Sequence, residues 1–241
     1  MRIVPIIQAR MGSTRLPGKV LMDIAGETML ARVVNRVRKA TRIHDTVVAT
    51  TVSEKDEPIV AECQKLNVAC FRGSEEDVLD RYYQAALRHR AEVVVRITSD
   101  CPLIDPELID EVIRAFVDGQ PATTYACNVL FPRGLDTEVI RLDALKKAWE
   151  EDRNPAWREH VTPYIIYHSN RFPRQDVRSE TNFSEMRWTV DTIDDLALVR
   201  RIYGNFHGDR FSWRNVVGIL NDHSEWLDLN RHVKQKTVQV Q

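Results

Sequence analysis

The first half of the chain alternates short apolar runs with segments whose apolar residues recur at helical spacing. Continuous apolar runs of strand length are typical of strands buried on both faces, and one-sided spacing is typical of amphipathic helices. The expected strands are "IVPII" near the N-terminus, 46–52, 68–71 and 92–98, and the expected helices are 28–39, 55–66, 79–87 and a segment that opens at Pro106 behind an Asp105 cap. This alternation predicts an α/β fold, with a mainly parallel sheet and helices on both faces.

Three polar loops follow expected strands, at 8–19, 72–78 and 98–105. Right-handed crossovers bring the loops after parallel strands to one edge of the sheet, where ligands bind in open α/β folds. The sequence therefore predicts a binding site built from these three loops.

The second half of the chain has a less regular pattern. Strands are expected at 122–127, 137–142 and 186–192, and helices at 143–151, 155–168, 193–203 and 212–233. There is no internal repeat, low-complexity stretch or clear linker. We therefore expect one domain over residues 1–241 with an elaborated C-terminal half.

Composition excludes several classes of protein. The 34 Lys and Arg residues balance 35 Asp and Glu residues, which argues against a nucleic-acid-binding surface. No apolar run approaches the ~18 residues of a membrane span, and the N-terminus lacks the regions of a signal peptide. The cysteines form no CxxC pair, so we expect reduced thiols of a cytoplasmic protein and no structural zinc site; they are Cys63, Cys70, Cys101 and Cys127.

The stretch "QARMGSTRLPGKVL", residues 8–21, is similar at first sight to a phosphate-binding loop. Five residues separate Gly12 from Gly18, and Val20 follows the lysine. A Walker loop has four residues at that place and a Ser or Thr after the lysine. This difference in spacing and residue type argues against kinase or GTPase chemistry.

The same loop places three cations directly after a buried strand. Arg10, Arg15 and Lys19 suit a polyphosphate, because arginine makes bidentate contacts with phosphate and lysine supplies a compact charge. The alternative is a basic loop that only faces solvent.

Two aspartates follow other expected strands. Asp100 lies in "TSDCPLIDP" and Asp191 in "TVDT", and oxygen ligands of this kind suit magnesium. The alternatives are that Asp100 only caps the turn before Pro102, and that Asp191 is the N-cap of the helix that begins near Ile193.

A further polar group lies in the central region. Arg133, Asp136 and Glu138 occur together in "RGLDTEV", where they would bind a sugar, close a dimer interface or only flank a turn at Gly134. His160 would act as a proton acceptor or would pack as a core histidine.

Taken together, these motifs resemble the cytidylyltransferases that activate acidic sugars. "IIQARMGSTRLPGKVL" resembles the N-terminal signature of CMP-KDO synthetase (3-deoxy-manno-octulosonate cytidylyltransferase), and it is closer still to the spore coat polysaccharide biosynthesis protein F group. The resemblance continues through "RGSEEDVLDRYYQAA" and "RITSDCPLIDPELID" and resumes at "RWTVDTIDDLALVRRIY". It covers residues 1 to about 203, and its stretch 140–180 depends mainly on the spore coat group.

The resemblance implies a nucleotide-diphospho-sugar transferase fold, which is a Rossmann-like three-layer sandwich with a mixed, mainly parallel sheet of about seven strands. It implies transfer of CMP from CTP to a sugar, with Mg²⁺ as the cofactor and pyrophosphate as the product, in surface polysaccharide biosynthesis. A nucleotide-binding half would then cover about 1–120, and a sugar-binding and dimerisation half about 121–241. Similar enzymes are homodimers, and we expect the interface within 125–170.

The resemblance also implies roles for single residues. Arg10, Lys19 and Asp100 would be catalytic, and Asp100 and Asp191 would hold the metal. The implied nucleotide-binding residues are Gln8, Ala9, Arg10, Gly12, Ser13, Arg15, Lys19, Arg72, Gly73, Ser74 and Asp100. The sugar contacts would be Arg133, Asp136, Glu138 and His160.

The chain departs from the CMP-KDO synthetases in two places. Cys101 stands where those enzymes carry a glutamate after the metal-binding aspartate, and the central region "FPRGLDTEV" and "REHVTPYI" differs. The resemblance therefore supports the nucleotide chemistry better than the identity of the sugar. A glycosyltransferase, a nucleotidyltransferase for another nucleotide and a non-catalytic nucleotide-sugar-binding protein remain alternatives.

Overall fold

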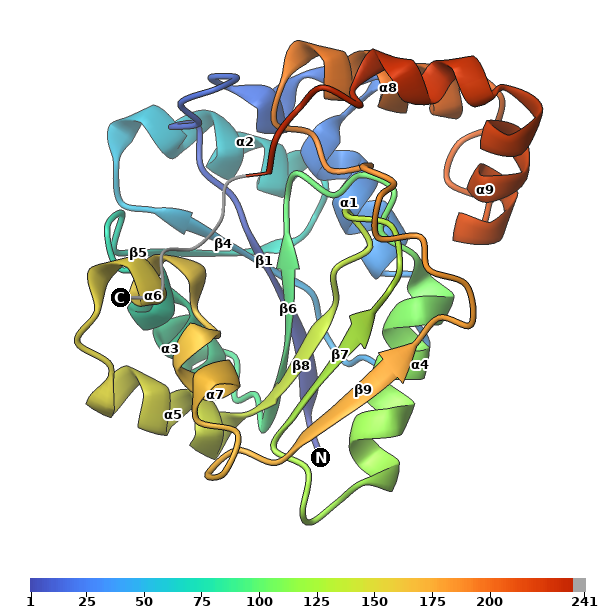
Figure 1. The fold of residues 1–241 in the computed structure, drawn as a ribbon. Coiled ribbons are helices and arrows are strands. Elements are labelled where there is room, and N and C mark those ends of the chain that lie inside the picture. The colour runs from blue at the N-terminus through green and yellow to red at the C-terminus, as the bar shows by residue number, and fades with distance from the viewer. Residues whose placement is uncertain (236–241) are drawn as a thin grey trace.

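The computed structural model describes residues 1–235 and contains one seven-stranded sheet (Figure 1). Its strands are β1 (Ile3–Gln8), β4 (Val47–Thr51), β5 (Ala69–Gly73), β6 (Val93–Thr98), β7 (Tyr125–Val129), β8 (Glu138–Arg141) and β9 (Arg174–Arg178). Their order in the sheet is β5-β4-β1-β6-β8-β7-β9. β8 runs antiparallel to both of its neighbours and the other pairings are parallel, which confirms the expected mixed, mainly parallel sheet.

Helices cover both faces of the sheet (Figure 1). One face packs against α1 (Met29–Val37), α2 (Glu57–Lys65), α4 (Pro106–Asp118), α8 (Ile193–Tyr203) and α9 (Trp213–Asp222). The other face packs against α3 (Val78–Arg88), α5 (Leu142–Glu151), α6 (Pro155–His160) and α7 (Pro163–Tyr167). The short elements are β2 (Asp23–Ile24), β3 (Glu27–Thr28) and three 3₁₀ turns, η1 (Lys19–Leu21), η2 (Glu54–Asp56) and η3 (Ser224–Leu229).

Strand β1 shows why its sequence is apolar throughout. Ile3 and Ile7 point into the core on one face of the sheet, and Val4 and Ile6 point into the core on the other face. Successive side chains of a strand alternate between faces, so a central strand covered on both sides buries every side chain. A charge in such a strand is therefore unusual, and Arg96 in β6 is one.

Four details of the second half differ from the sequence prediction, two in strands and two in helices. Residues 186–192 form no strand of the sheet, because their backbone bonds instead with loops, through an isolated bridge between Arg133 and Arg187 and a bond from Val190 N to Asp100 O. The edge strand β9 was not predicted, because its largely charged sequence "RQDVR" carries no apolar signal. Charged residues are common in edge strands, where they discourage pairing with other chains.

The predicted helix 155–168 is two helices, α6 and α7. Val161 ends α6 with a φ of 71°, and Pro163 opens α7. Proline lacks a backbone N–H and cannot continue a preceding helix, so the chain turns here. The predicted helix 212–233 likewise divides into α9 and η3. No helix within residues 1–235 combines the length and apolar character needed to span a membrane.

Candidate active site

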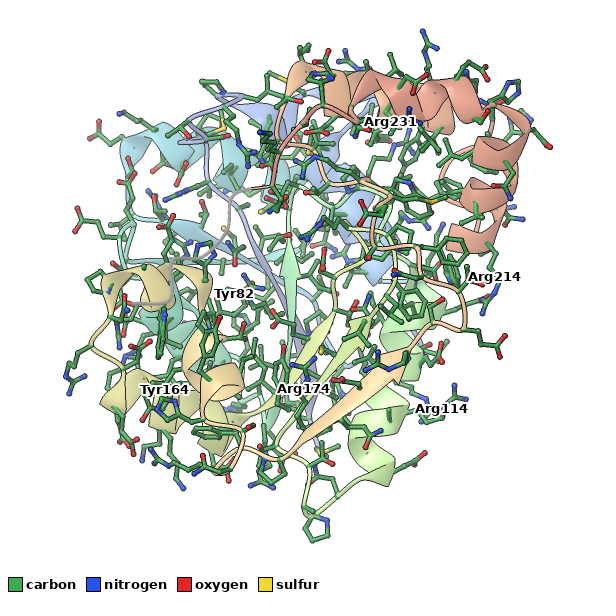
Figure 2. The ribbon with its side chains drawn as sticks, viewed as in Figure 1. Tyr82, Arg114, Tyr164, Arg174, Arg214 and Arg231 are labelled. Atoms are coloured by element: carbon green, nitrogen blue, oxygen red, sulfur yellow. The ribbon has the colours of Figure 1, made fainter. Side chains whose placement is uncertain are left out.

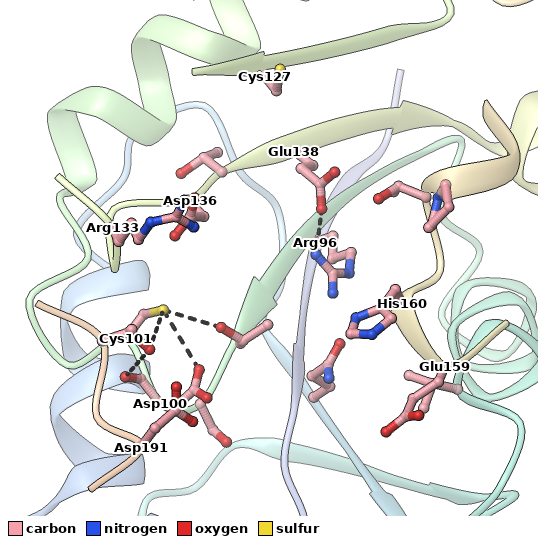
Figure 3. Close-up of a pocket in the computed structure, with 18 of the residues that line it drawn as sticks. Arg96, Asp100, Cys101, Cys127, Arg133, Asp136, Glu138, Glu159, His160 and Asp191 are labelled. Atoms are coloured by element: carbon pink, nitrogen blue, oxygen red, sulfur yellow. Dashed lines mark hydrogen bonds and ion pairs between the residues drawn. The ribbon is translucent and has the colours of Figure 1, made fainter. Parts of the chain in front are cut away.

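A cleft of about 870 Å³ opens beyond the carboxyl ends of β1 and β6 and extends along β7 and β8 (Figure 3). The loops that follow β1 and β6 form one end of it, and residues of 125–138 and of α6 and α7 form the other. The predicted edge of the sheet therefore carries the cavity. Of the loop 72–78, which was also expected there, only Val78 lines it.

The loop after β1 is folded by its own backbone. The N–H groups of Ser13 and Gly18 both donate to the carbonyl of Met11, at 2.9 and 3.0 Å, and Met11 N donates to Asp56. Gly18 has a φ of 70°, a left-handed conformation that glycine adopts without steric cost. This turn starts η1 and directs Lys19 into the cleft.

The ammonium group of Lys19 binds three acceptors from two other loops. It donates to Asp100 Oδ2 at 2.8 Å, to Asp191 Oδ1 at 2.9 Å and to the carbonyl of Val190 at 2.7 Å. Burial lowers the pKa of Lys19, but the charges of Asp100 and Asp191 outweigh that effect and the net pKa is raised. Lys19 is therefore a fixed cation held between two carboxylates.

Asp191 is the more fully neutralised of the two carboxylates. Besides Lys19, its side chain pairs with Arg15 at 2.7 Å and with Arg187 at 2.7 Å. Burial raises its pKa, but these cations outweigh burial and lower the pKa below the usual value. Thr192, and not Asp191, is the N-cap of α8, so the alternative role for Asp191 is wrong.

Asp100 has a freer carboxylate. Its Oδ2 accepts the bond from Lys19. Within residues 1–235, its Oδ1 receives only a weak contact from the thiol of Cys101 at 3.6 Å. Among residues 1–235, no three His, Cys, Asp or Glu side chains gather into a metal cage. Magnesium needs few protein ligands, since one or two carboxylates and substrate phosphates complete its shell. Asp100 and Asp191 together fit that requirement.

The predicted sugar contacts all line the cleft: Glu138 and His160 lie at its far end, and Arg133 and Asp136 lie on the side of Cys101 and Asp100 (Figure 3). Glu138 pairs with Arg96 and accepts a hydrogen bond from the hydroxyl of Tyr125. His160 is exposed at the cleft wall and is not a packed core residue, although partial burial still lowers its pKa. Arg133 and Asp136 are exposed to the cleft.

Four residues of the predicted nucleotide-binding set do not line the cleft: Gly12, Arg72, Gly73 and Ser74. Arg72 instead donates to the carbonyls of Thr51 and Ser53 and pairs with Glu57. These partners lie at the ends of β4 and α2 and hold the side chain there. The predicted contacts of these four residues with the nucleotide stay predictions that their positions do not support.

Sequence analysis missed several charged residues that the fold brings to the site. Arg96 and Arg81 line the cleft, and Arg187 holds Asp191 from behind. Arg96 had a usable signal, because it is a cation within the apolar run "VVVRIT" of a central strand. Arg81 and Arg187 carried no such signal, since neither interrupts a continuous apolar run: Arg81 stands between Asp80 and Tyr82, and Arg187 between Met186 and Trp188.

Comparisons with known proteins identify the family of the chain. A family model described as cytidylyltransferase matches residues 4–208. An uncharacterized protein of Methanocaldococcus jannaschii is 37% identical over 243 residues, which cover 98% of each chain. The spore coat polysaccharide biosynthesis protein SpsF of Bacillus subtilis is 37% identical over 83% of this chain and 86% of its own length.

More distant relatives extend the same result. A 3-deoxy-manno-octulosonate cytidylyltransferase of Anaeromyxobacter sp. is 37% identical over 58% of this chain and 57% of its own. The solved structure of a cytidylyltransferase from Leptospira borgpetersenii superposes with a TM-score of 0.91 at 30% identity, over 99% of this chain and 100% of that one. The Rossmann-like nucleotidyltransferase fold and the resemblance are both confirmed, and the chain belongs to the cytidylyltransferase family.

Proposed function

We propose that the protein transfers CMP from CTP to a sugar and releases pyrophosphate. The observation that carries this proposal is the position of Lys19 between Asp100 and Asp191, at the carboxyl ends of β1 and β6. Such a group of fixed charges suits phosphoryl chemistry, in which positioning and electrostatic stabilisation supply most of the catalysis. No protein nucleophile is required.

The cations of the loop after β1 would bind the triphosphate. Lys19 and Arg15 now pair with carboxylates, and Arg10 pairs with the exposed Glu159 at 3.2 Å. Exposed pairs of this kind contribute little stability, so a triphosphate can compete for the guanidinium of Arg10. In the reaction these cations stabilise the negative charge that moves onto pyrophosphate.

Magnesium would be held by Asp100 and Asp191. When bound, it would supply positive charge that stabilises the negative charge developing on the phosphates. The chain itself provides two carboxylates for the metal. The cations beside these carboxylates are directed toward the same phosphates.

The sugar would occupy the end of the cleft between Arg133, Glu138 and His160. The spore coat polysaccharide name of the Bacillus subtilis relative supports a role in surface polysaccharide biosynthesis. We further propose a cytoplasmic homodimer with an interface within 125–170. Light scattering of the purified chain tests the dimer, and a monomeric mass would contradict it.

The experiment for the main proposal is a pyrophosphate-release assay with Mg²⁺ and each of CTP, UTP, ATP and GTP. The acceptors are a panel of 2-keto-3-deoxy acids, neutral sugars and sugar phosphates. Calorimetry measures the binding of each nucleotide in parallel. We expect pyrophosphate release and nucleotide binding to show a clear preference for CTP. Equal results with all four nucleotides would make the chain a less selective nucleotidyltransferase. If no pair of nucleotide and acceptor releases pyrophosphate, the proposal is rejected.

Asp100→Asn tests the metal assignment. The amide keeps the size of the side chain but loses the charge, so we expect magnesium-dependent turnover to be abolished while circular dichroism stays unchanged. Asp228→Asn is the matched control, because Asp228 is exposed, pairs with Arg231 and does not line the cleft. Full activity of Asp100→Asn would mean that Asp100 only shapes the turn.

A further inference from the structure

Asp136 differs from every other carboxylate that lines the cleft. The lining carboxylates are Asp100, Asp136, Glu138, Glu159 and Asp191. Within residues 1–235, each of the other four forms an ion pair with a lysine or an arginine, and Asp136 forms none. An uncompensated charge in a binding cleft is costly unless a ligand uses it.

The backbone around Gly134 fixes the position of Asp136. Gly134 has a φ of 102°, and a Cβ added there would lie 2.6 Å from Thr189 N and 2.7 Å from Trp188 C. The loop thus lies directly against the backbone that leads to Asp191. Such contact needs a residue without a side chain, which explains the glycine.

One oxygen of Asp136 is used to orient the side chain, and the other has no hydrogen-bond partner within residues 1–235. Oδ2 accepts a hydrogen bond from Gly134 N at 2.9 Å. In the next residue, Thr137 N donates to Asn128 Oδ1 at 2.8 Å, which ties the loop to β7. Oδ1 is therefore directed by a braced loop and remains available to a substrate.

Asp136 lies close to the reacting end of the cleft. Figure 3 shows it beside Arg133, on the side of the cleft where Cys101 and Asp100 lie. The Cys101 thiol contacts Asp100. Burial is the main cause that raises the pKa of this thiol, and the negative charges of Asp100 and Asp136 raise it further. Both carboxylates are thus near the same sulfur atom.

The surroundings of Asp136 favour proton uptake. Asp136 is exposed to the cleft, yet it lies deep in the protein, and this enclosure raises its pKa. The charge of Glu138 in β8 raises the pKa of Asp136 further. The bond from Gly134 N and the charges of Arg133, in the same loop, and Arg96, in β6, lower it. The thiol of Cys101 faces Asp136 from the loop after β6. The net pKa remains above that of an ordinary aspartate.

We propose that Asp136 is the general base that accepts the proton of the attacking sugar hydroxyl. This inference rests on the proposed function. The hydroxyl oxygen forms a bond to the α-phosphorus, and the bond from that phosphorus to the oxygen shared with the β-phosphate breaks. The electron pair of the broken bond leaves with pyrophosphate, and the hydroxyl proton passes to Asp136.

The test compares the wild type with Asp136→Asn, using CTP, Mg²⁺ and whichever acceptor of the panel the wild type uses fastest. A general base is worth about 10²–10⁴-fold in rate, so kcat should fall by that factor. The Kd of CTP, from calorimetry, should remain within about twofold. Asp143→Asn is the control, because Asp143 is exposed on α5 and outside the cleft.

The pH profile separates a base from a simple sugar contact. Protonation inactivates a base, so kcat/KM of the wild type should fall on the acid side, and this fall should be absent in Asp136→Asn. Asp136→Glu should recover part of the rate and the acid-side fall. In Asp136→Ala, added formate should increase the rate in proportion to its concentration, with no such effect on the wild type.

Each other result rejects the assignment. A wild type without an acid-side fall, an Asp136→Asn variant with normal kcat, or one in which only the acceptor KM rises would show that Asp136 is not the base. If the wild type releases pyrophosphate from CTP and only the variants give a result other than the expected one, the proposed function stands. If the wild type releases no pyrophosphate from CTP with any acceptor, both proposals fail together.

Discussion

At the scale of single residues, Lys19 joins three separate parts of the chain. It belongs to the loop after β1, and its partners Asp100 and Asp191 follow β6 and precede α8. The positive charge of Lys19 reduces the repulsion between the two carboxylates, and the carboxylates keep Lys19 protonated through their effect on its pKa. One side chain therefore holds the two carboxylates of the site together.

Lys19→Ala should reduce kcat by about 10²–10³-fold, which is the usual cost of removing a donor that stabilises a developing charge. The expected change in the Kd of CTP is smaller, because Arg10 and Arg15 remain. Steady-state kinetics and calorimetry measure the two quantities, and Lys146→Ala on the exposed face of α5 is the control. A change confined to the Kd would identify Lys19 as a ground-state anchor.

The position of Lys19 at the cleft was predictable from the sequence, and its partners were only partly so. The loop residues stand next to one another in "QARMGSTRLPGK", so a reader sees the cluster directly. Arg187 and Asn230 act through contacts that only the folded chain creates, since Asn230 donates to Asp195 over 35 positions in sequence. Pairing of that kind leaves no local pattern.

At the scale of elements, the N-terminus of α8 is a rigid support for Asp191. Thr192 and Asp195 form a capping box, and Asp195 Oδ2 also accepts a bond from Asp191 N at 2.9 Å. Arg187 pairs with Asp195 and Asp191 together. Asn230, just after η3, donates to Asp195 Oδ1 and to the carbonyl of Arg187, at 2.9 Å each.

Asn230→Ala should lower the free energy of unfolding by about 1–3 kcal/mol, because it leaves the buried carbonyl of Arg187 without a donor and removes one of the two donors to Asp195 Oδ1. Asn230 itself is buried, and Asn221 on the exposed side of α9 supplies the control variant Asn221→Ala. Urea unfolding followed by circular dichroism measures both. Equal stabilities for the two variants would show that solvent replaces the lost bonds at no cost.

Gly134→Ala tests the close contact between the 133–136 loop and residues 188–189. A methyl group there meets backbone atoms that cannot move aside easily, and a positive φ costs a non-glycine residue about 1–2 kcal/mol in addition. We expect a lower Tm and a lower kcat from displacement of Asp136. Gly208→Ala is the control, because Gly208 also has a positive φ but open space around it; similar kcat values for the two variants would contradict the proposed contact.

At the scale of the whole molecule, the seven-stranded sheet contains some strands that the sequence pattern predicted well and others that it predicted poorly. The parallel strands β1, β4 and β6 were predictable because they are buried apolar runs, and the half-buried edge strand β5 was predictable from the short run "VACF". On the far side of the sheet, the strands expected at 122–127 and 137–142 correspond to β7 and β8, but the antiparallel insertion of β8 between β6 and β7 and the charged edge strand β9 were not predicted. Long-range pairing, and not local propensity, decides those positions.

The same molecule should lose stability in acid through the carboxylates at the start of α8. Burial raises the pKa of Asp191 and of Asp195, but their cations and hydrogen bonds outweigh burial, and both pKa values lie below that of an unfolded aspartate. The unfolded chain therefore binds protons first as the pH falls, and stability increases with pH across that window. The contribution is complete above about pH 4 and is lost as the pH falls through the folded pKa.

Urea unfolding at pH 7, 5, 4 and 3 measures this dependence. The wild type should change little between pH 7 and 5 through these groups and should lose stability below pH 4. Asp195→Asn removes one of the titrating groups, so its stability should fall less steeply in acid, although it starts lower because the capping box is lost. Asp194→Asn, at a half-exposed neighbour in the same turn, should keep the wild-type slope. Identical acid slopes for Asp195→Asn and the wild type would mean that other carboxylates, and not this support of Asp191, control the acid stability of the fold.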